Sequence, residues 1–279
     1  MKLAILSGKG GTGKTFVAVN LAVAAGTSTY IDCDVEEPNG RLFLKPEQLT
    51  TQTVATKMPA FDGEKCIGCR KCVDFCRFNA LVYIKDKPMV FAEICHSCGG
   101  CALVCPAGTI TEIDKPVGTV ERGVRGDINV VTGCLNLGMP SGTPVIEAAL
   151  AYTGGADELT VIDCPPGSSC TVMDSVRGAD YCLLVAEPTA FGLHNFKMVY
   201  ELATLLGKPC GVVINKADGE YPALEDFCAE HGIPILCRIP YSEELATLGA
   251  SGDIAVCAND KYAKLFRDLL TDIKKEARA

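Results

Sequence analysis

Short apolar runs alternate with amphipathic stretches along most of the chain. Runs typical of buried strands fall at residues 3–6, 29–32, 128–131, 159–163, 181–186, 210–214 and 235–239. Stretches with helical spacing lie at residues 15–25, 143–152, 193–206 and 222–231. Buried strands that alternate with helices predict an α/β fold, with a doubly wound, mostly parallel sheet covered by helices on both faces.

One segment interrupts this alternation. From about residue 59 to residue 117 closely spaced cysteines replace the apolar runs, and the alternation resumes afterwards. The charges from Asp62 to Lys115 balance, whereas the whole chain has a net charge of −8. We therefore predict one α/β domain made of residues 1–58 and 118–279, with residues 59–117 inserted into it as a small domain.

The composition is that of a folded globular protein. The 279 residues are 48% hydrophobic and 22% charged, which provides enough apolar content for a sizeable core. The negative net charge argues against a protein that coats nucleic acid, and no apolar run approaches the roughly 20 residues that span a bilayer. The N-terminus, MKLAILSGKG, shows no cleavable secretion signal. We expect a cytoplasmic protein without nucleic-acid partners.

The chain contains 17 cysteines. Cytoplasmic thiols are kept reduced, so this number indicates metal or redox chemistry rather than disulfides. Eight of the cysteines form two runs, CIGCRKCVDFC at 66–76 and CHSCGGCALVC at 95–105, which share the spacing C-x2-C-x2-C-x3-C. The first three thiolates of such a run hold one 4Fe–4S cluster, and the fourth serves the other cluster. The predicted ligands are Cys66, Cys69, Cys72 and Cys105 for one cluster, and Cys95, Cys98, Cys101 and Cys76 for the second.

The doubled run resembles the bacterial two-cluster ferredoxin over about 55 residues, and the resemblance implies a small α+β domain. One position departs from that pattern, because Arg77 follows Cys76 where the family has a proline. We expect this to alter the local turn and the cluster potential without abolishing cluster binding. Zinc is the alternative metal, although zinc sites use paired C-x2-C hooks rather than triple runs. His96 lies between the ligands, and we expect it to be a solvated loop residue.

A glycine-rich loop, GKGGTGKT at 8–15, follows the first predicted strand and precedes the first predicted helix. It fits the pattern G-x4-G-K-[ST], in which glycine N–H groups and a helix N-terminus surround phosphate oxygens. In such a loop Lys14 reaches the β- and γ-phosphates of ATP, and the Thr15 hydroxyl binds Mg²⁺. An ordinary glycine loop is the alternative. The residues expected to contact ATP or ADP here are Gly8, Gly10, Gly11, Thr12, Gly13, Lys14, Thr15 and Phe16.

Lys9 makes the loop more specific. A second lysine directly after the first glycine resembles the deviant Walker A loop, KGGxGKT, of the MinD/ParA/Mrp/nitrogenase-iron-protein ATPases. The resemblance implies that Lys9 reaches the nucleotide of a partner subunit, so that the active form is a nucleotide-dependent dimer. A solvated loop lysine is the alternative.

Acidic residues lie where that family has its switch regions. Asp32 and Asp34 in YIDCDVEEPN resemble the switch I aspartates, which implies that Asp34 orients the attacking water and Asp32 supports Mg²⁺. Asp163 ends the run LTVID and resembles the Walker B and switch II acid, with Gly167 free to move toward the γ-phosphate. An aspartate that caps a helix is the simpler explanation for any one of these residues.

Two later residues resemble the positions that hold the base, namely Asn215 in VVINKAD and Pro240 in RIPYSEE. Nearly the whole chain resembles the MinD-superfamily P-loop ATPases with an inserted ferredoxin domain. This implies ATP binding, slow hydrolysis, two 4Fe–4S clusters, and a homodimer or a heterodimer with a paralogous ATPase. The resemblance does not identify the client protein. It is compatible with two functions: ATP-gated electron delivery, and the assembly and insertion of a metal or iron–sulfur cofactor.

Two further functions compete with this one. A positioning ATPase of the MinD type would need an amphipathic membrane anchor at its C-terminus, whereas a passive ferredoxin-type carrier would use its nucleotide site only for structure or regulation. We expect the C-terminal stripe to be a helix packed on the sheet, because acids dilute its lysines, and we expect no membrane binding. The stripe consists of Tyr262, Leu265, Phe266, Leu269, Leu270 and Ile273.

One scattered cysteine also fits a functional pattern. Cys170 lies seven residues after Asp163, and the nitrogenase iron protein has a cysteine at similar spacing that binds a cluster shared between subunits. Cys134 is the nearest candidate for the second cysteine that such a cluster needs. The alternatives for Cys170 are a transient metal or thiol role and a small buried packing residue.

Overall fold

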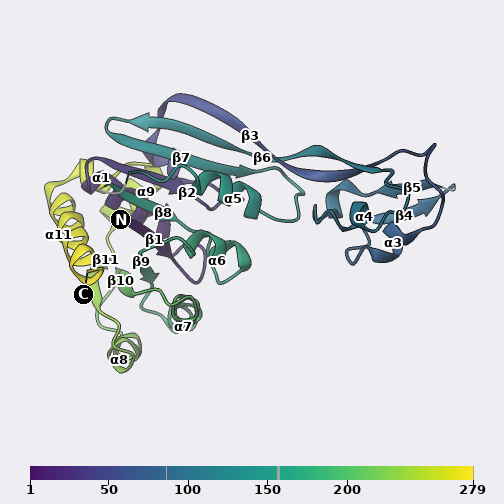
Figure 1. Ribbon diagram of the computed structural model, residues 1–279. Helices are drawn as coiled ribbons and strands as arrows, with labels where there is room; N and C mark the ends of the chain where they lie inside the picture. Colours follow the sequence, from purple (N-terminus) through teal and green to yellow (C-terminus); the bar gives the residue numbers. More distant parts are fainter. Residues whose placement is uncertain (86, 156–157, 279) are drawn as a thin grey trace.

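The computed structural model describes residues 1–85, 87–155 and 158–278 (Figure 1). Within these ranges, nine strands form one sheet in the order β11-β10-β9-β1-β8-β2-β7-β6-β3. The seven strands from β11 to β7 pair in parallel, which confirms the predicted mostly parallel α/β sheet. These strands are β1 (Lys2–Leu6), β2 (Ser28–Asp32), β7 (Ile128–Leu135), β8 (Leu159–Asp163), β9 (Tyr181–Ala186), β10 (Cys210–Ala217) and β11 (Ile235–Pro240).

Successive residues of the central strands face opposite sides of the sheet, and each side has its own core. Leu3 and Ile5 of β1 belong to one hydrophobic cluster, and Ala4 and Leu6 belong to the other. The helices that contribute to the first cluster are α1 (Lys14–Ala24), α2 (Gly40–Leu44), α9 (Glu243–Ser251), α10 (Ala255–Ala258) and α11 (Asp260–Glu276). Those that contribute to the second are α5 (Thr143–Leu150), α6 (Cys170–Val176), α7 (Ala190–Leu205) and α8 (Pro222–Glu230).

The C-terminal stripe is part of this core. Helix α11 buries Tyr262, Phe266, Leu269, Leu270 and Ile273 in the first cluster, and this confirms that the helix packs on the sheet. Among the described residues, no helix is long and apolar enough to cross a membrane.

Two long antiparallel strands extend the sheet at the β7 edge and then leave it. Strand β3 (Glu47–Phe61) pairs with β6 (Ile110–Arg125) along most of its length, whereas β6 pairs with β7 only from Gly118 to Arg125. The pair therefore continues past the sheet as a two-stranded ribbon (Figure 1). The predicted domain boundaries at residues 59 and 117 lie inside these strands.

The residues 62–109, which we call the cysteine-rich module, occupy the tip of this ribbon. Figure 1 shows the module at the opposite end of the molecule from α11, with the ribbon between them. The module contains a short antiparallel hairpin and three short helical segments. These elements are α3 (Lys71–Phe75), β4 (Leu81–Ile84), β5 (Lys87–Val90), the 3-10 helix η1 (Ala92–Ile94) and α4 (Gly100–Leu103).

Candidate functional site

The glycine-rich loop joins β1 to α1 and admits little substitution. A Cβ on Gly13 would lie 2.2 Å from Nδ2 of Asn215, and a Cβ on Gly8 would lie 2.1 Å from the carbonyl oxygen of Asn195. Gly11 and Gly13 also have φ values of 79° and 91°, in the left-handed region that favours glycine. Because Gly8 and Gly13 have no side chain, the loop packs tightly against β10 and α7.

The loop opens onto a cavity of about 600 Å³. Its wall also includes residues that the sequence did not single out, among them Glu37, Phe43 and Pro166 from the segments that follow β2 and β8. The predicted residues in this wall are Lys9, Gly10, Gly11, Gly13, Lys14, Thr15, Phe16 and Asp34. The predicted residues outside it are Gly8, Thr12, Asp32, Asp163, Asn215 and Pro240.

Lys14 forms the ionic centre of the site. Its Nζ donates to Oδ1 of Asp163 at 2.6 Å and lies 3.6 Å from Oδ2 of Asp34. Tyr30 donates its hydroxyl to Oδ2 of Asp163 at 2.9 Å, so both oxygens of this buried carboxylate have partners. Burial alone would lower the pKa of Lys14, but Asp163 and Asp34 raise it above its ordinary value. Lys14 is therefore charged and available to exchange a carboxylate for a phosphate.

Asp32 lies behind the cavity wall. Its side chain is fully buried and accepts hydrogen bonds from the backbone N–H groups of Asp34 at 3.1 Å and Gly40 at 2.9 Å. Burial, together with the nearby Asp163, raises the pKa of Asp32 to about 8, although Lys14 and both N–H groups oppose the shift. Through these two hydrogen bonds, Asp32 holds the turn that places Asp34 in the cavity wall.

The ends of β9 and β10 hold the loop from its other side. Asn215 donates Nδ2 to the carbonyl of Thr12 at 2.7 Å, and Lys216 donates Nζ to the carbonyl of Gly11 at 2.7 Å. Glu187 forms ion pairs with Lys9 at 2.6 Å and with Lys216 at 2.5 Å. The sequence analysis did not identify Glu187 or Lys216. The feature that could have pointed to them is that each is a charged residue at or near the end of a buried strand.

Pro240 ends β11, the neighbour of β10, and is exposed. Its Cα pairs with that of Ala217, two residues after Asn215 in β10. The two residues predicted to hold the base therefore come from adjacent strand ends.

The cysteine-rich module contains two small cavities, and each is lined by four cysteines. Each cavity combines three cysteines of one run with the last cysteine of the other run. The structure thus brings together the two sets that the spacing predicted. The first cavity is lined by Cys66, Cys69, Cys72 and Cys105, and the second by Cys76, Cys95, Cys98 and Cys101.

Both runs fold in the same way. Gly68 and Arg70 in the first run, and Ser97 and Gly99 in the second, all have φ values between 56° and 70°. Arg70 and Ser97 are not glycines, so each adopts an uncommon conformation. This alternation wraps each run around its cavity.

The turn after each run is also shared. The N–H of Asn79 donates to the carbonyl of Cys76 at 3.2 Å, and that of Gly108 donates to Cys105 at 3.2 Å. The turn after Cys76 therefore persists without the proline that Arg77 replaces, and the expectation of an altered turn is wrong. His96 is exposed in the loop, as expected, and its ring also stacks on that of Phe78 with centroids 3.8 Å apart.

The thiols of the module differ in environment. Burial raises the pKa of Cys72 and Cys101, whereas the hydrogen bond with Thr109 holds the pKa of Cys105 below its ordinary value. Within the described ranges, no group of three or more His, Cys, Asp or Glu side chains is placed to hold a single metal ion. The four thiols of each set line a common cavity instead of converging on one point.

Cys170 is exposed at the first residue of α6, after the N-cap residue Ser169. The alternative that it is a buried packing residue is therefore wrong for this state of the chain. Cys134 is partly buried on β7, and burial raises its pKa.

Comparisons with known proteins agree with this geometry. A family model described as the CobQ/CobB/MinD/ParA nucleotide binding domain matches residues 3–256. The fold is similar to that of the septum site-determining protein MinD complexed with Mg-ADP from Pyrococcus horikoshii, with a TM-score of 0.60, 20% identity, and coverage of 99% of this chain and 96% of that one.

Two relatives from Methanocaldococcus jannaschii add sequence similarity. An uncharacterized protein is 28% identical over 285 residues, which cover 99% of this chain and 97% of the relative. An uncharacterized ferredoxin is 42% identical over 60 residues, which cover 20% of this chain and 78% of the relative.

Proposed function

The chain belongs to the CobQ/CobB/MinD/ParA nucleotide-binding family, and we propose that it is an ATP-hydrolysing iron–sulfur protein. In this proposal, a nucleotide-driven dimer switch acts on two 4Fe–4S clusters that serve a client protein. The observation that carries it is the presence, in one chain, of a phosphate-type loop and two cavities with four cysteines each, joined by strands of one sheet.

We propose that the loop binds Mg-ATP. Lys14 would exchange Asp163 and Asp34 for the β- and γ-phosphates, since a triphosphate carries more negative charge than these two carboxylates together. The Thr15 hydroxyl would bind Mg²⁺, with Asp32 behind it, and Asp34 would orient the attacking water. Thr15 lines the cavity and Asp32 is buried behind its wall, and their hydroxyl and carboxyl oxygens are of the kind that Mg²⁺ prefers, so these two residues fit the ion.

We propose that residues 59–117 form a ferredoxin domain. Two features of the chain fit two 4Fe–4S clusters: the cysteine sets meet at separate cavities, and both runs repeat the same left-handed positions. The similarity of 60 residues to a ferredoxin supports the same assignment. When bound, such clusters supply one-electron transfer.

The ribbon supplies a physical connection between the two sites. Val35, which follows Asp34, accepts a hydrogen bond from the N–H of Leu135 in β7 at 2.8 Å. The next N–H, that of Asn136, donates to the carbonyl of Val117 in the ribbon at 2.9 Å. Movement of the Asp34 segment on ATP binding or hydrolysis would therefore reach the strands that carry the module.

Iron and sulfide analysis beside ATP turnover tests this proposal. The anaerobically reconstituted chain should hold about eight irons, and Cys66→Ser should lose about four of them. Cys257→Ser is the matched control, because Cys257 is an exposed cysteine outside the module. Zinc in place of iron, or no ATP turnover, would overturn the proposal. Clusters that survive repeated turnover would favour electron delivery, and clusters that pass to an acceptor protein would favour assembly.

A further inference from the structure

One carboxylate, that of Glu187, pairs both with Lys9 of the phosphate loop and with Lys216, a residue of β10 that donates to the loop. Glu187 follows β9, and its side chain is 10% exposed. Its Oε2 lies 2.6 Å from Nζ of Lys9, and its Oε1 lies 2.5 Å from Nζ of Lys216. Burial alone would raise the pKa of Glu187, but the two ammonium groups hold it below its ordinary value. The carboxylate is therefore ionised at neutral pH.

The backbone fixes this carboxylate in place. The N–H of Thr189 donates to the carbonyl of Glu187 at 2.8 Å, and the Thr189 hydroxyl accepts from the N–H of Gly192 at 2.9 Å. A Cβ on Gly192 would lie 2.2 Å from the Glu187 carbonyl oxygen, so the turn depends on that glycine. Glu187 is thus held on a rigid turn between a buried strand and a capped helix.

The two lysines are held differently. Lys216 also donates to the carbonyl of Gly11 at 2.7 Å, and its φ of 54° places a non-glycine residue in the left-handed region. Lys9 has a second, weaker contact, with the ring of Phe191 at 5.8 Å, and its side chain is 24% exposed. If Lys9 moves away from Glu187, Lys216 still pairs with this carboxylate. The movement of Lys9 therefore leaves no unpaired buried charge.

We propose that Glu187 holds Lys9 within its own subunit and thereby opposes dimerisation until ATP is bound. This inference rests on the proposed nucleotide-bridged dimer, in which Lys9 reaches the phosphates of the partner subunit. To do so Lys9 must exchange Glu187 for phosphate oxygens. A triphosphate competes for an ammonium better than a diphosphate does, so the exchange makes dimerisation depend on the γ-phosphate. Glu187 is a positioning residue, because it acts through Lys9.

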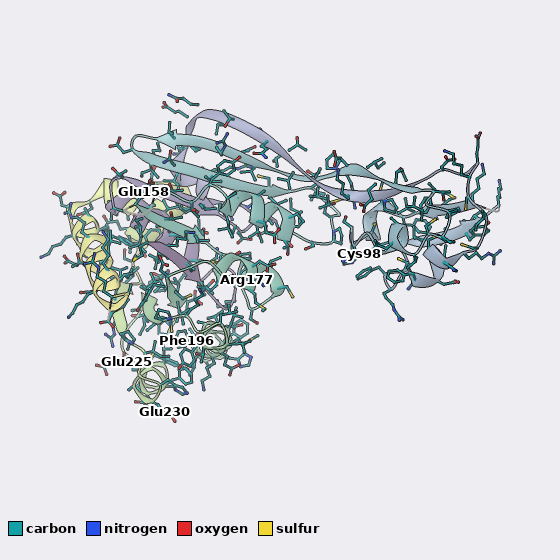
Figure 2. All side chains as sticks on the ribbon, in the orientation of Figure 1. Cys98, Glu158, Arg177, Phe196, Glu225 and Glu230 are labelled. Atoms are coloured by element: carbon teal, nitrogen blue, oxygen red, sulfur yellow. The ribbon has the colours of Figure 1, made fainter. Side chains whose placement is uncertain are left out.

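Chemical labelling of lysines tests the contact in the monomer. In the full chain without nucleotide, Glu187→Gln should raise the rate at which an amine-reactive reagent labels Lys9 by several-fold, measured by peptide mass spectrometry. Lys264, exposed on α11, serves as the internal reference. Glu225→Gln is the matched control. Glu225 lies on α8, pairs with Arg238 of β11 at 3.0 Å, and is not among the residues that line the nucleotide cavity (Glu225 is labelled in Figure 2). An unchanged Lys9 rate in Glu187→Gln would overturn the proposal whatever the dimer does.

Dimerisation tests the consequence. In an Asp34→Ala background, which we expect to bind ATP without hydrolysing it, sedimentation velocity should show half-maximal dimer at a lower ATP concentration when Glu187→Gln is added. We expect a shift of roughly three- to tenfold, the effect of one partly buried ion pair. The affinity for ADP, measured alongside, reports any change in the nucleotide site itself. Adding Lys9→Ala should remove the gain.

The outcomes separate the two proposals. A higher Lys9 labelling rate without an ATP-induced dimer in any variant would overturn the nucleotide-bridged dimer, and the role of Glu187 with it. A dimer that forms at the same or a higher ATP concentration in Glu187→Gln would overturn the role of Glu187 alone. A gain that persists in Lys9→Ala would show that Glu187 acts through another group, which also contradicts the proposal.

Discussion

The nucleotide loop and the cysteine-rich module differ in what holds them together without ligands. Both lysines of the loop already have a carboxylate partner: Lys14 pairs with Asp163, and Lys9 pairs with Glu187. The module has few such partners and little core. Among its described residues, the only buried apolar side chains are those of Cys72, Ala80, Leu81 and Pro88. We therefore expect the loop to exchange these partners for a ligand, and the module to depend on a bound ligand for its stability.

The exposed apolar surface shows the same contrast. Large hydrophobic side chains that remain exposed are concentrated in the module. Figure 2 labels Cys98 in the module and Phe196 in the nucleotide-binding part, and the ribbon lies between these two parts. Segments of this size rarely bury enough apolar area to be stable on their own, and a metal or another cross-link usually supplies the remaining stability. The exposed residues are Ile67, Phe75, Phe78, Ile84, Met89, Phe91, Ile94 and Leu103.

The largest expected effect is the loss of the module on removal of iron. Without clusters, amide hydrogens of residues 62–109 should exchange at least about a hundredfold faster than in the reconstituted chain, because cluster binding energy becomes folding energy. Exchange in β1 and β8 should be unchanged. Hydrogen–deuterium exchange with mass spectrometry measures both regions in one experiment. Equal protection of the module with and without iron would contradict the comparison.

The next effect concerns the loop. Lys14→Ala should reduce nucleotide binding at least about a hundredfold and should also destabilise the sheet by about 3 kcal/mol, because it removes the cation from the buried Asp163. Calorimetric titration with ADP and chemical unfolding measure the two effects. Iron content should stay at the wild-type value. A variant that loses iron together with ADP binding would show that the two regions do not fold independently.

The difference between the regions also explains what the sequence revealed. The parallel strands were predictable because strands buried on both faces, such as 3–6 and 181–186, are continuous apolar runs. The ribbon was not, because β3 is exposed along most of its first half and its polar sequence TTQT has no buried face. Three cysteines of each set were predictable because their spacing is local, and the fourth followed from the exchange of last cysteines between two such runs. Glu187 was not, because the chain separates it from Lys9 by more than half its length and only the fold joins them.

A smaller effect than the two above is expected in the pH dependence of the unfolding free energy, to which the buried Asp32 of the nucleotide site contributes. Burial raises the pKa of Asp32 from about 3.8 to about 8, so between these values the folded chain binds a proton that the unfolded chain has lost. Unfolding free energy should therefore fall as pH rises from 4 to 8 and then level off. Asp32→Asn should flatten this slope by up to a few kcal/mol across the window. Urea unfolding of the nucleotide-free chain at several pH values measures it, and an equal slope in both proteins would contradict the assignment to Asp32.

The smallest effect tests the one exposed thiol near the nucleotide site whose spacing suggested a metal role. Cys170→Ser should change the unfolding free energy by less than about 0.5 kcal/mol, because the side chain is exposed and serine is nearly isosteric. Iron in the reconstituted monomer should also be unchanged, since the eight module cysteines are intact. The informative sample is the proposed ATP-bound dimer. In it we expect the two segments that follow Asp163, each with the start of α6, to respond to the nucleotide. A loss of about four irons per dimer in Cys170→Ser, with none in Cys257→Ser, would place a third cluster between the subunits. Equal iron in both dimers would confine iron to the module and leave the nucleotide region without a metal–sulfur centre of its own.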